Sequence, residues 1–167
     1  LLKYKDNQIA IRFYGEDGRK QFLTYQNLYD EVASLSLALK NSGIKKGDRI
    51  CGVLPNIPET IIVMLATTSI GAIWSSCSPD FGSKSILDRF KQIDPKILFV
   101  TDGYMYNGKK IELLSKFRDV LQKLPSIKKT IIIPFIFEIK KMNIPKSIMW
   151  DEFKDTLATE ITFEHFP

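Results

Sequence analysis

The sequence has few of the residues on which metal, disulfide and triad chemistry depends. It contains two cysteines and one histidine in 167 residues. Cys51 and Cys77 are far apart in the chain, and each lies in an apolar segment. We therefore predict buried free thiols in a reducing compartment, not a metal or redox pair. His165 has no serine or aspartate in register with it, which argues against a catalytic triad. We predict no metal site.

Long basic runs and unbroken apolar runs are also missing. The net charge is +5, but the lysines stand as isolated doublets without aromatic neighbours, so we expect no nucleic-acid partner. Between Cys51 and Pro79 only Glu59 is charged, yet Pro55, Pro58 and Glu59 interrupt this segment. A buried helix and strand explain it better than a membrane span does. With no secretory signal pattern at its start, the protein is expected in the cytoplasm, without a membrane partner. The sequence also starts without Met, so we expect a leading segment to precede it.

What the sequence does contain is the composition of a globular domain, 44% apolar and 26% charged. The turn signal at 15–18 separates two strands, 9–14 and 20–23, and predicts a hairpin. Thr24 is placed to cap the next helix, which Gly43 ends. Asn56 and Glu59 are interpreted as an N-cap and a capping-box residue. We expect further strands at 49–54, 72–76, 97–100 and 130–133, and further helices from 58 to 70, 83 to 93, 109 to 124 and 150 to 157.

This alternation predicts an α/β fold with three layers, in which βαβ units build a mainly parallel sheet covered on both faces. The strands are apolar on both sides, as buried parallel strands are. Ligands bind at the carboxyl ends of such strands, here the loops at 54–56, 76–82 and 101–107. We divide the chain into a leading hairpin (1–23), an α/β subdomain (24–134), and a variable loop and connector (135–167).

Several short motifs, taken in order, resemble the adenylate-forming acyl-CoA synthetases. These are Gly47-Asp48-Arg49, Pro55-Asn56-Ile57-Pro58-Glu59, Gly71-Ala72 and Asp94-Pro95-Lys96. Finer motifs are similar to the acetoacetyl-CoA synthetase subfamily, namely Ile73-Trp74-Ser75-Ser76, Ser78-Pro79-Asp80-Phe81-Gly82, Leu87-Asp88-Arg89-Phe90 and Tyr106-Asn107-Gly108-Lys109. The resemblance covers nearly the whole chain and implies part of the large N-terminal domain of such an enzyme.

The resemblance implies a two-step ligase for the full-length protein. ATP and acetoacetate would form an acyl-adenylate and pyrophosphate with the help of Mg²⁺, and the thiolate of coenzyme A would then displace AMP. The family's Gly-rich phosphate loop, ribose motif and catalytic lysine would follow this segment. We therefore assign no catalytic residue here. The segment alone is expected to be inactive, to hold no cofactor tightly, and to self-associate through the face that the missing parts would cover.

In the related acetyl-CoA synthetases, a loop and a basic residue near the start of a later helix hold the nucleotide end of coenzyme A. The corresponding loop here is Ser78, Pro79, Asp80, Phe81 and Gly82, and the later place is Tyr106 to Lys109. We expect Lys109 near a helix N-terminus, which favours a phosphate. Tyr106 replaces one residue of the family's basic pair and could stack on adenine. The alternatives are a solvated surface lysine for Lys109, and for Phe81 and Gly82 a plain turn with one buried aromatic. Asp80 is more typical of a helix-entry turn than of a catalyst.

Two side chains receive structural interpretations. Trp74 is expected in the core, although it could wall an acyl pocket, and Arg89 is expected to pair with a carboxylate. Two functional alternatives also remain open. One is a ligase for another short acid, since this segment does not fix acid identity. The other is a free-standing flavodoxin-like domain that binds a nucleotide or a partner protein.

Overall fold

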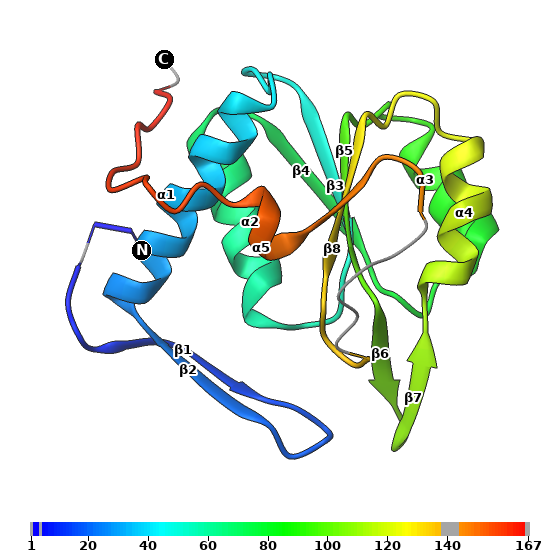
Figure 1. Cartoon of the computed structure of the whole chain (residues 1–167), viewed down its shortest axis with the longest axis horizontal. Helices are drawn as coiled ribbons and strands as arrows, with labels where there is room; N and C mark the ends of the chain where they lie inside the picture. The colour runs from blue at the N-terminus through cyan, green and yellow to red at the C-terminus, as the bar shows by residue number, and fades with distance from the viewer. Residues whose placement is uncertain (1, 4, 138–143, 166–167) are drawn as a thin grey trace.

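A five-stranded parallel sheet forms the centre of the protein (Figure 1). The computed structural model describes residues 2–3, 5–137 and 144–165. The strand order is β4-β3-β5-β8-β9, and every neighbouring pair is parallel. The strands are β3 (Arg49–Val53), β4 (Ile73–Cys77), β5 (Ile97–Thr101), β8 (Lys129–Ile133) and β9 (Ser147–Met149). The predicted parallel sheet is therefore confirmed.

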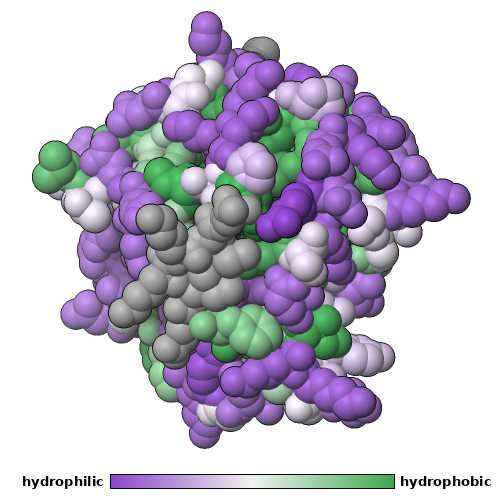
Figure 2. All heavy atoms as spheres, turned by 45° about the vertical axis from the view of Figure 1, so that its right-hand side comes forward, coloured by the Kyte–Doolittle hydropathy of each residue, from purple (hydrophilic) through white to green (hydrophobic). Residues whose placement is uncertain are grey.

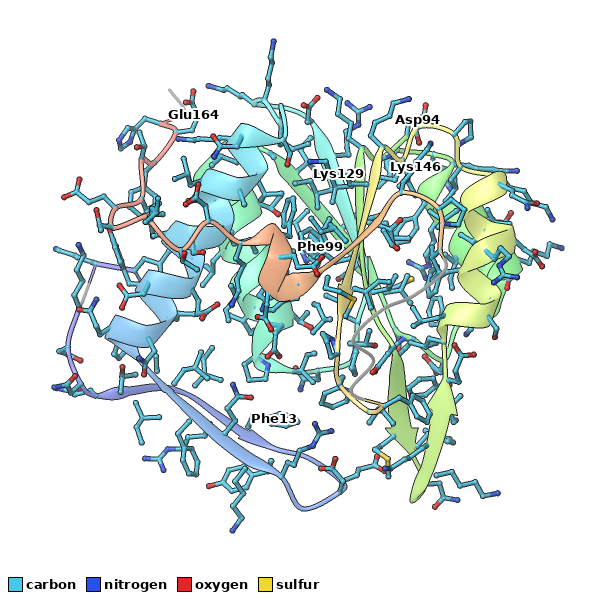
Figure 3. All side chains as sticks on the ribbon, viewed as in Figure 1. Phe13, Asp94, Phe99, Lys129, Lys146 and Glu164 are labelled. Atoms are coloured by element: carbon cyan, nitrogen blue, oxygen red, sulfur yellow. The ribbon has the colours of Figure 1, made fainter. Side chains whose placement is uncertain are left out.

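Helices cover both faces of this sheet and make the three predicted layers (Figure 1). One face carries α1 (Tyr25–Asn41), α2 (Pro58–Ser69) and the short α5 (Trp150–Phe153), and the other carries α3 (Ser83–Phe90) and α4 (Leu114–Gln122). Alternate strand residues supply two separate cores. Phe99 of β5 packs edge-on against Trp150 and Phe153 of α5, with ring centroids 6.2 and 6.3 Å apart (Figure 3). Full burial of each such side chain stabilises the fold by about 1.5–3 kcal/mol.

Two hairpins extend beyond the carboxyl end of the sheet (Figure 1). The first pairs β1 (Ile9–Tyr14) with β2 (Lys20–Thr24), as predicted, and its Phe13 packs against Phe135. The second pairs β6 (Gly103–Tyr106) with β7 (Lys109–Glu112). The tips of the two hairpins lie close together, as shown by the distance of 3.5 Å between Gly108 N–H and the Glu16 carboxylate.

The predicted ends of α1 are confirmed. Thr24 caps the helix and forms a reciprocal capping box with Asn27. Gly43, just beyond the last turn, has a φ of +80°, a conformation that glycine adopts without steric cost.

The predicted start of α2 is wrong by one position. Ile57, not Asn56, is the N-cap, and no side chain caps this end. Because a residue that precedes proline is confined to extended conformations, Ile57 stays outside the helix and Pro58 opens it. Glu59 therefore does not form the expected capping box.

Three other predictions of secondary structure also differ. The region 109–124 is not one helix, because β7 occupies its start and α4 begins only at Leu114. The segment 135–147, expected as a variable loop, leads into the fifth strand, β9, although residues 138–143 lie outside the described part. The last helix, α5, ends at Phe153, four residues earlier than predicted.

The strand order places a topological switch point between β3 and β5. The chain runs from β3 to β4 on one side and then returns to β5 on the other side. The crevice beyond the carboxyl ends of these strands is where open α/β sheets bind ligands. Residues 54–56 and 102–103 border it. None of the helices in the described ranges is long and apolar enough to cross a membrane.

The surface on the side of α4 is mostly hydrophilic (Figure 2). Hydrophobic side chains appear there as small separate groups among charged ones. The described residues that are visible on this side form no continuous apolar face.

Candidate functional site

The loop at 78–82, which we call the 78–82 loop, follows the carboxyl end of β4 and leads into α3. Its turn is closed by Phe81 N–H, which donates to Ser78 O at 3.3 Å. Pro79 is buried, Phe81 is half-buried, and the other three residues are exposed. The guanidinium of Arg89 lies over the Phe81 ring, 4.9 Å from its centroid. Arg89 thus packs on an aromatic ring, where we had expected a carboxylate partner.

Lys116, in the first turn of α4, contacts the 78–82 loop directly. Its Nζ donates to Pro79 O at 3.1 Å and to Phe81 O at 3.2 Å. Burial lowers the pKa of Lys116, while the nearby charges of Asp80, Cys77 and Glu112 oppose this shift. An ammonium group is therefore held among carbonyl oxygens at the base of the loop. Our sequence reasoning did not single out this residue.

Tyr106 and Lys109 are brought together, but not at a helix terminus. They form the last cross-strand pair of the β6–β7 hairpin, next to a turn made by Asn107 and Gly108. Both turn residues have positive φ, 50° and 72°, as a two-residue hairpin turn requires. Our placement of Lys109 near a helix N-terminus is therefore wrong, and helix-dipole support for a phosphate there is lost. The Asn-Gly pair was the signal that predicts a hairpin, and it was overlooked.

One face of this hairpin continues from the 78–82 loop to the tip. Tyr104 and Ile111 form the pair at its root on the same face as Tyr106 and Lys109. Burial raises the pKa of the Tyr104 hydroxyl, and the neighbouring carboxylate of Asp80 raises it further. The loop and the hairpin also share one core cluster, since Phe81 packs against the group of buried side chains that includes Tyr104. The exposed side chains of Tyr106 and Lys109 extend this surface outward.

Asp102, at the carboxyl end of β5, fixes the root of the hairpin. Its fully buried carboxylate accepts three backbone N–H bonds, from Phe135 at 3.0 Å, Ile136 at 2.8 Å and Phe137 at 3.0 Å. Such a set satisfies an ionised carboxylate without a cation. At Gly103 a Cβ would lie 2.6 Å from Ile111 O, so the two hairpin strands approach here as only glycine allows. Sequence reasoning missed Asp102, because its partners come from a turn 33 or more residues away.

A separate cleft of about 510 Å³ lies between β2, α1, α2 and α5. Glu59 faces it, and burial raises the pKa of this carboxyl group, with the charge of Glu31 adding to the effect. Lys154 bridges to Glu31 at 2.9 Å. None of the residues that we expected to bind a ligand lines this cleft.

The interpretations of the two cysteines and of Trp74 agree with the structure. Cys51 and Cys77 are buried and unpaired, as predicted. Trp74 packs against the core beneath α1 and α2, and a Cβ on Gly52 would lie 2.4 Å from its ring, so Gly52 makes room for it. Across the described residues, no cluster of His, Cys, Asp and Glu has the arrangement of a metal site. His165 is exposed in the C-terminal tail.

Comparison with known proteins matches both the chain and its fold. The family described as AMP-binding enzyme matches residues 2–159. Acetoacetyl-CoA synthetase of Macaca fascicularis is 39% identical over the whole chain, which covers 26% of that protein. Acetoacetyl-coenzyme A synthetase of Rhizobium meliloti (strain 1021) is 49% identical over 81% of the chain and 20% of that protein.

A solved structure, acetoacetyl-CoA synthetase from Streptomyces lividans, superimposes with a TM-score of 0.89 at 34% identity. It covers 96% of this chain, which spans 24% of that structure. The chain therefore spans about a quarter of the length of the proteins it resembles. Because the family match extends over nearly all of its residues, the chain belongs to the AMP-binding enzyme family.

Proposed function

We propose that this chain is an N-terminal portion of an acetoacetate–CoA ligase. The complete enzyme converts ATP, acetoacetate and coenzyme A to acetoacetyl-CoA, AMP and pyrophosphate. Mg²⁺ neutralises charge on the phosphates during adenylate formation. The reacting groups lie in parts of the enzyme outside these 167 residues, so the chain alone does not catalyse either step.

The observation that carries this proposal is similarity over the full length of the chain. Proteins named acetoacetyl-CoA synthetase match it at 37–49% identity in mammals, a bird, an amphibian, a fish, a nematode and a bacterium. The S. lividans structure of that name shares the fold at 34% identity. Because relatives from such distant organisms all carry the name acetoacetyl-CoA synthetase, they favour acetoacetate over another short acid as the substrate.

Within this portion, the 78–82 loop together with Tyr106 and Lys109 contributes to binding the nucleotide end of coenzyme A. Three features support the proposal. Phe81 of the loop packs against the core cluster that contains Tyr104 of the hairpin. Tyr106 offers an exposed aromatic ring for stacking on adenine. Lys109, directly across the hairpin, offers a mobile positive charge for a phosphate.

Pyrophosphate release tests the proposed function. The complete protein is incubated with ATP, Mg²⁺, coenzyme A and acetoacetate, and the 167-residue chain is assayed in parallel. We expect acetoacetate-dependent release by the complete protein and none by the chain alone. If pyrophosphate release depends on a different short acid, that acid is the substrate and the assignment of acetoacetate is wrong. No release with any short acid would reject the ligase assignment.

The hairpin offers a matched pair of variants for the coenzyme A site. Lys109→Met removes the charge on the proposed binding face, whereas Lys110→Met removes one on the opposite face, across from Met105. We expect the first to raise the KM for coenzyme A by about threefold to tenfold, the value of a partly exposed charge contact. The second should leave it unchanged. If the two variants change the KM for coenzyme A equally, Lys109 is not part of the binding site.

A further inference from the structure

We propose that Lys116 is a positioning residue that sets the shape of the 78–82 loop and thereby the affinity for coenzyme A. The inference rests on the proposed function, because it assigns the loop to that ligand. Lys116 touches neither the reacting atoms nor any residue previously assigned to the site except the loop itself. Its contacts are to the loop backbone, which explains how one side chain can control the conformation of all five residues.

The geometry of the contact favours a positioning role. Pro79 O and Phe81 O stand on either side of Asp80, and Nζ of Lys116 bonds to both, at 3.1 and 3.2 Å. One ammonium group thus fixes the orientation of both carbonyl groups next to Asp80. Without it, two acceptors in a partly buried place would lose their donor, and the turn would keep only the long 3.3 Å bond from Phe81 N–H to Ser78 O.

A second contact holds the loop from α3, which lies beside α4 on the same face of the sheet. Arg89 of α3 lies over the ring of Phe81. The loop is therefore clamped between α3, which holds a side chain, and α4, which holds the backbone. Arg89 alone leaves the peptide groups free to rotate, so the orientation of the carbonyls depends on Lys116.

Lys116 also links the loop to the β6–β7 hairpin. The carboxylate of Glu112, the last residue of β7, accepts from Ser115 N–H at 3.0 Å and from Ser115 Oγ at 2.7 Å. These two bonds attach the first turn of α4 to the hairpin. Lys116 is the next residue along the helix, so the loop, the helix start and the hairpin form one connected unit. The two segments proposed to hold coenzyme A are thus set relative to each other through α4.

The test uses the complete protein with Lys116→Met, which keeps the length of the side chain and removes its donors. Lys123→Met, an exposed position at the end of the same helix, is the control. We expect Lys116→Met to raise the KM for coenzyme A about tenfold, since a hydrogen bond from a charged group contributes about that factor or more. Acetoacetate-dependent exchange between ATP and pyrophosphate, which needs no coenzyme A, should be unchanged. Lys116→Arg should retain most of the affinity.

Hydrogen exchange of the loop amides separates this inference from the proposed function. Residues 80–82 should exchange faster in Lys116→Met than in the parent or the Lys123→Met control. If the parent protein shows no exchange between ATP and pyrophosphate with any acid, the proposed function fails while the hydrogen-exchange result still tests the role of Lys116 in the loop. An unchanged KM for coenzyme A, or a loss of both half-reactions together, would overturn the inference.

Discussion

Cys51 and Cys77 illustrate how burial controls chemistry at the scale of single residues. Both lie in the core between the sheet and the pair α3 and α4. Burial raises the pKa of the Cys77 thiol to about 11 and holds that of Cys51 well above its ordinary value. Since the thiolate is the reactive form, both thiols are inert at neutral pH. The sequence alone predicted this, because each cysteine stands in an apolar run.

We therefore expect neither cysteine of the folded protein to react with iodoacetamide at pH 8. Both should react once urea unfolds the chain, because exposure restores their ordinary pKa values. Mass spectrometry of the labelled protein measures the outcome. Rapid labelling of either cysteine without denaturant would show that the core between the sheet and α4 is open.

Asp48 links residue chemistry to the pH dependence of stability. Burial by itself raises the pKa of this carboxyl group, but bonds from Lys96 Nζ at 2.7 Å and Lys45 N–H at 2.9 Å outweigh it. The pKa is left below its ordinary value of 3.8. A carboxyl group whose pKa is lowered by folding stabilises the fold above that ordinary value, and the stabilisation is lost as the pH falls through the folded-state pKa.

The variant Asp48→Asn should lower the free energy of unfolding at pH 7 by about 1–2 kcal/mol, the range for one hydrogen-bonded, partly buried charge. Urea unfolding at pH 7 measures the loss, and Asp119→Asn, at an exposed position on α4, is the control. The difference between the two variants should shrink as the pH falls through the folded-state pKa of Asp48, because this carboxyl group then becomes protonated in the parent too. A loss that stays the same as the pH falls would contradict the electrostatic explanation.

At the scale of elements, the periodic pattern of the sequence predicted most of the fold. The strands at 49–54, 97–100 and 130–133 and the helix after Thr24 match β3, β5, β8 and α1 closely. The boundaries that failed did so where one residue overrides a pattern. Because of Pro58, the N-cap of α2 lies one residue later than predicted. Asn107 and Gly108 form a hairpin turn next to the segment that was predicted to start a helix. β9 could not be predicted, because three residues carry too little periodicity to distinguish a strand from a loop.

Gly108 gives a direct test of the hairpin. With φ at +72° and open space around its α-carbon, Gly108→Ala meets no clash and is disfavoured by backbone conformation alone. We expect a loss of about 1 kcal/mol in the free energy of unfolding. Gly82→Ala is the control, since Gly82 has equal space but an ordinary φ of −66°.

Faster hydrogen exchange confined to residues 103–112 should accompany the loss at Gly108. Such local opening would also explain any weakening of coenzyme A binding, because Tyr106 and Lys109 depend on this turn. Equal stability of the two alanine variants would contradict the observed turn conformation.

At the scale of the molecule, one edge strand of the sheet is suited to pairing with a strand of another copy of the chain. β4 lies at one edge of the sheet, carries no charged residue, and leaves the side chain of Ile73 51% exposed. Edge strands in stable monomers usually carry charges that prevent pairing. We propose that the 167-residue chain, studied alone, associates with itself through this edge.

Sedimentation velocity tests this proposal directly. The chain should form oligomers whose population rises with concentration, and Ile73→Lys should shift it toward monomer. Lys84, exposed on α3, offers a control as Lys84→Gln, which should leave the association unchanged. A monomer at all concentrations would argue for a free-standing domain rather than a part of a larger enzyme.

The acid that the complete enzyme accepts is the property that the sequence of this portion could not determine. The alternating pattern and short motifs identified the family, but no motif in these residues specifies which acid is bound. The proposed coenzyme A site is only partly predictable from the sequence. Tyr106 and Lys109 could be found from motifs, whereas Lys116 and Asp102 act through backbone contacts that only the folded chain reveals.

The most direct test of the account is the specificity constant of the complete protein for competing acids. The ratio kcat/KM is measured with acetoacetate, acetate and butyrate at saturating ATP and coenzyme A, with the thioester product identified by mass. Our account predicts formation of acetoacetyl-CoA and the highest kcat/KM for acetoacetate. Preference for another acid, or no thioester with any of the three, would contradict it.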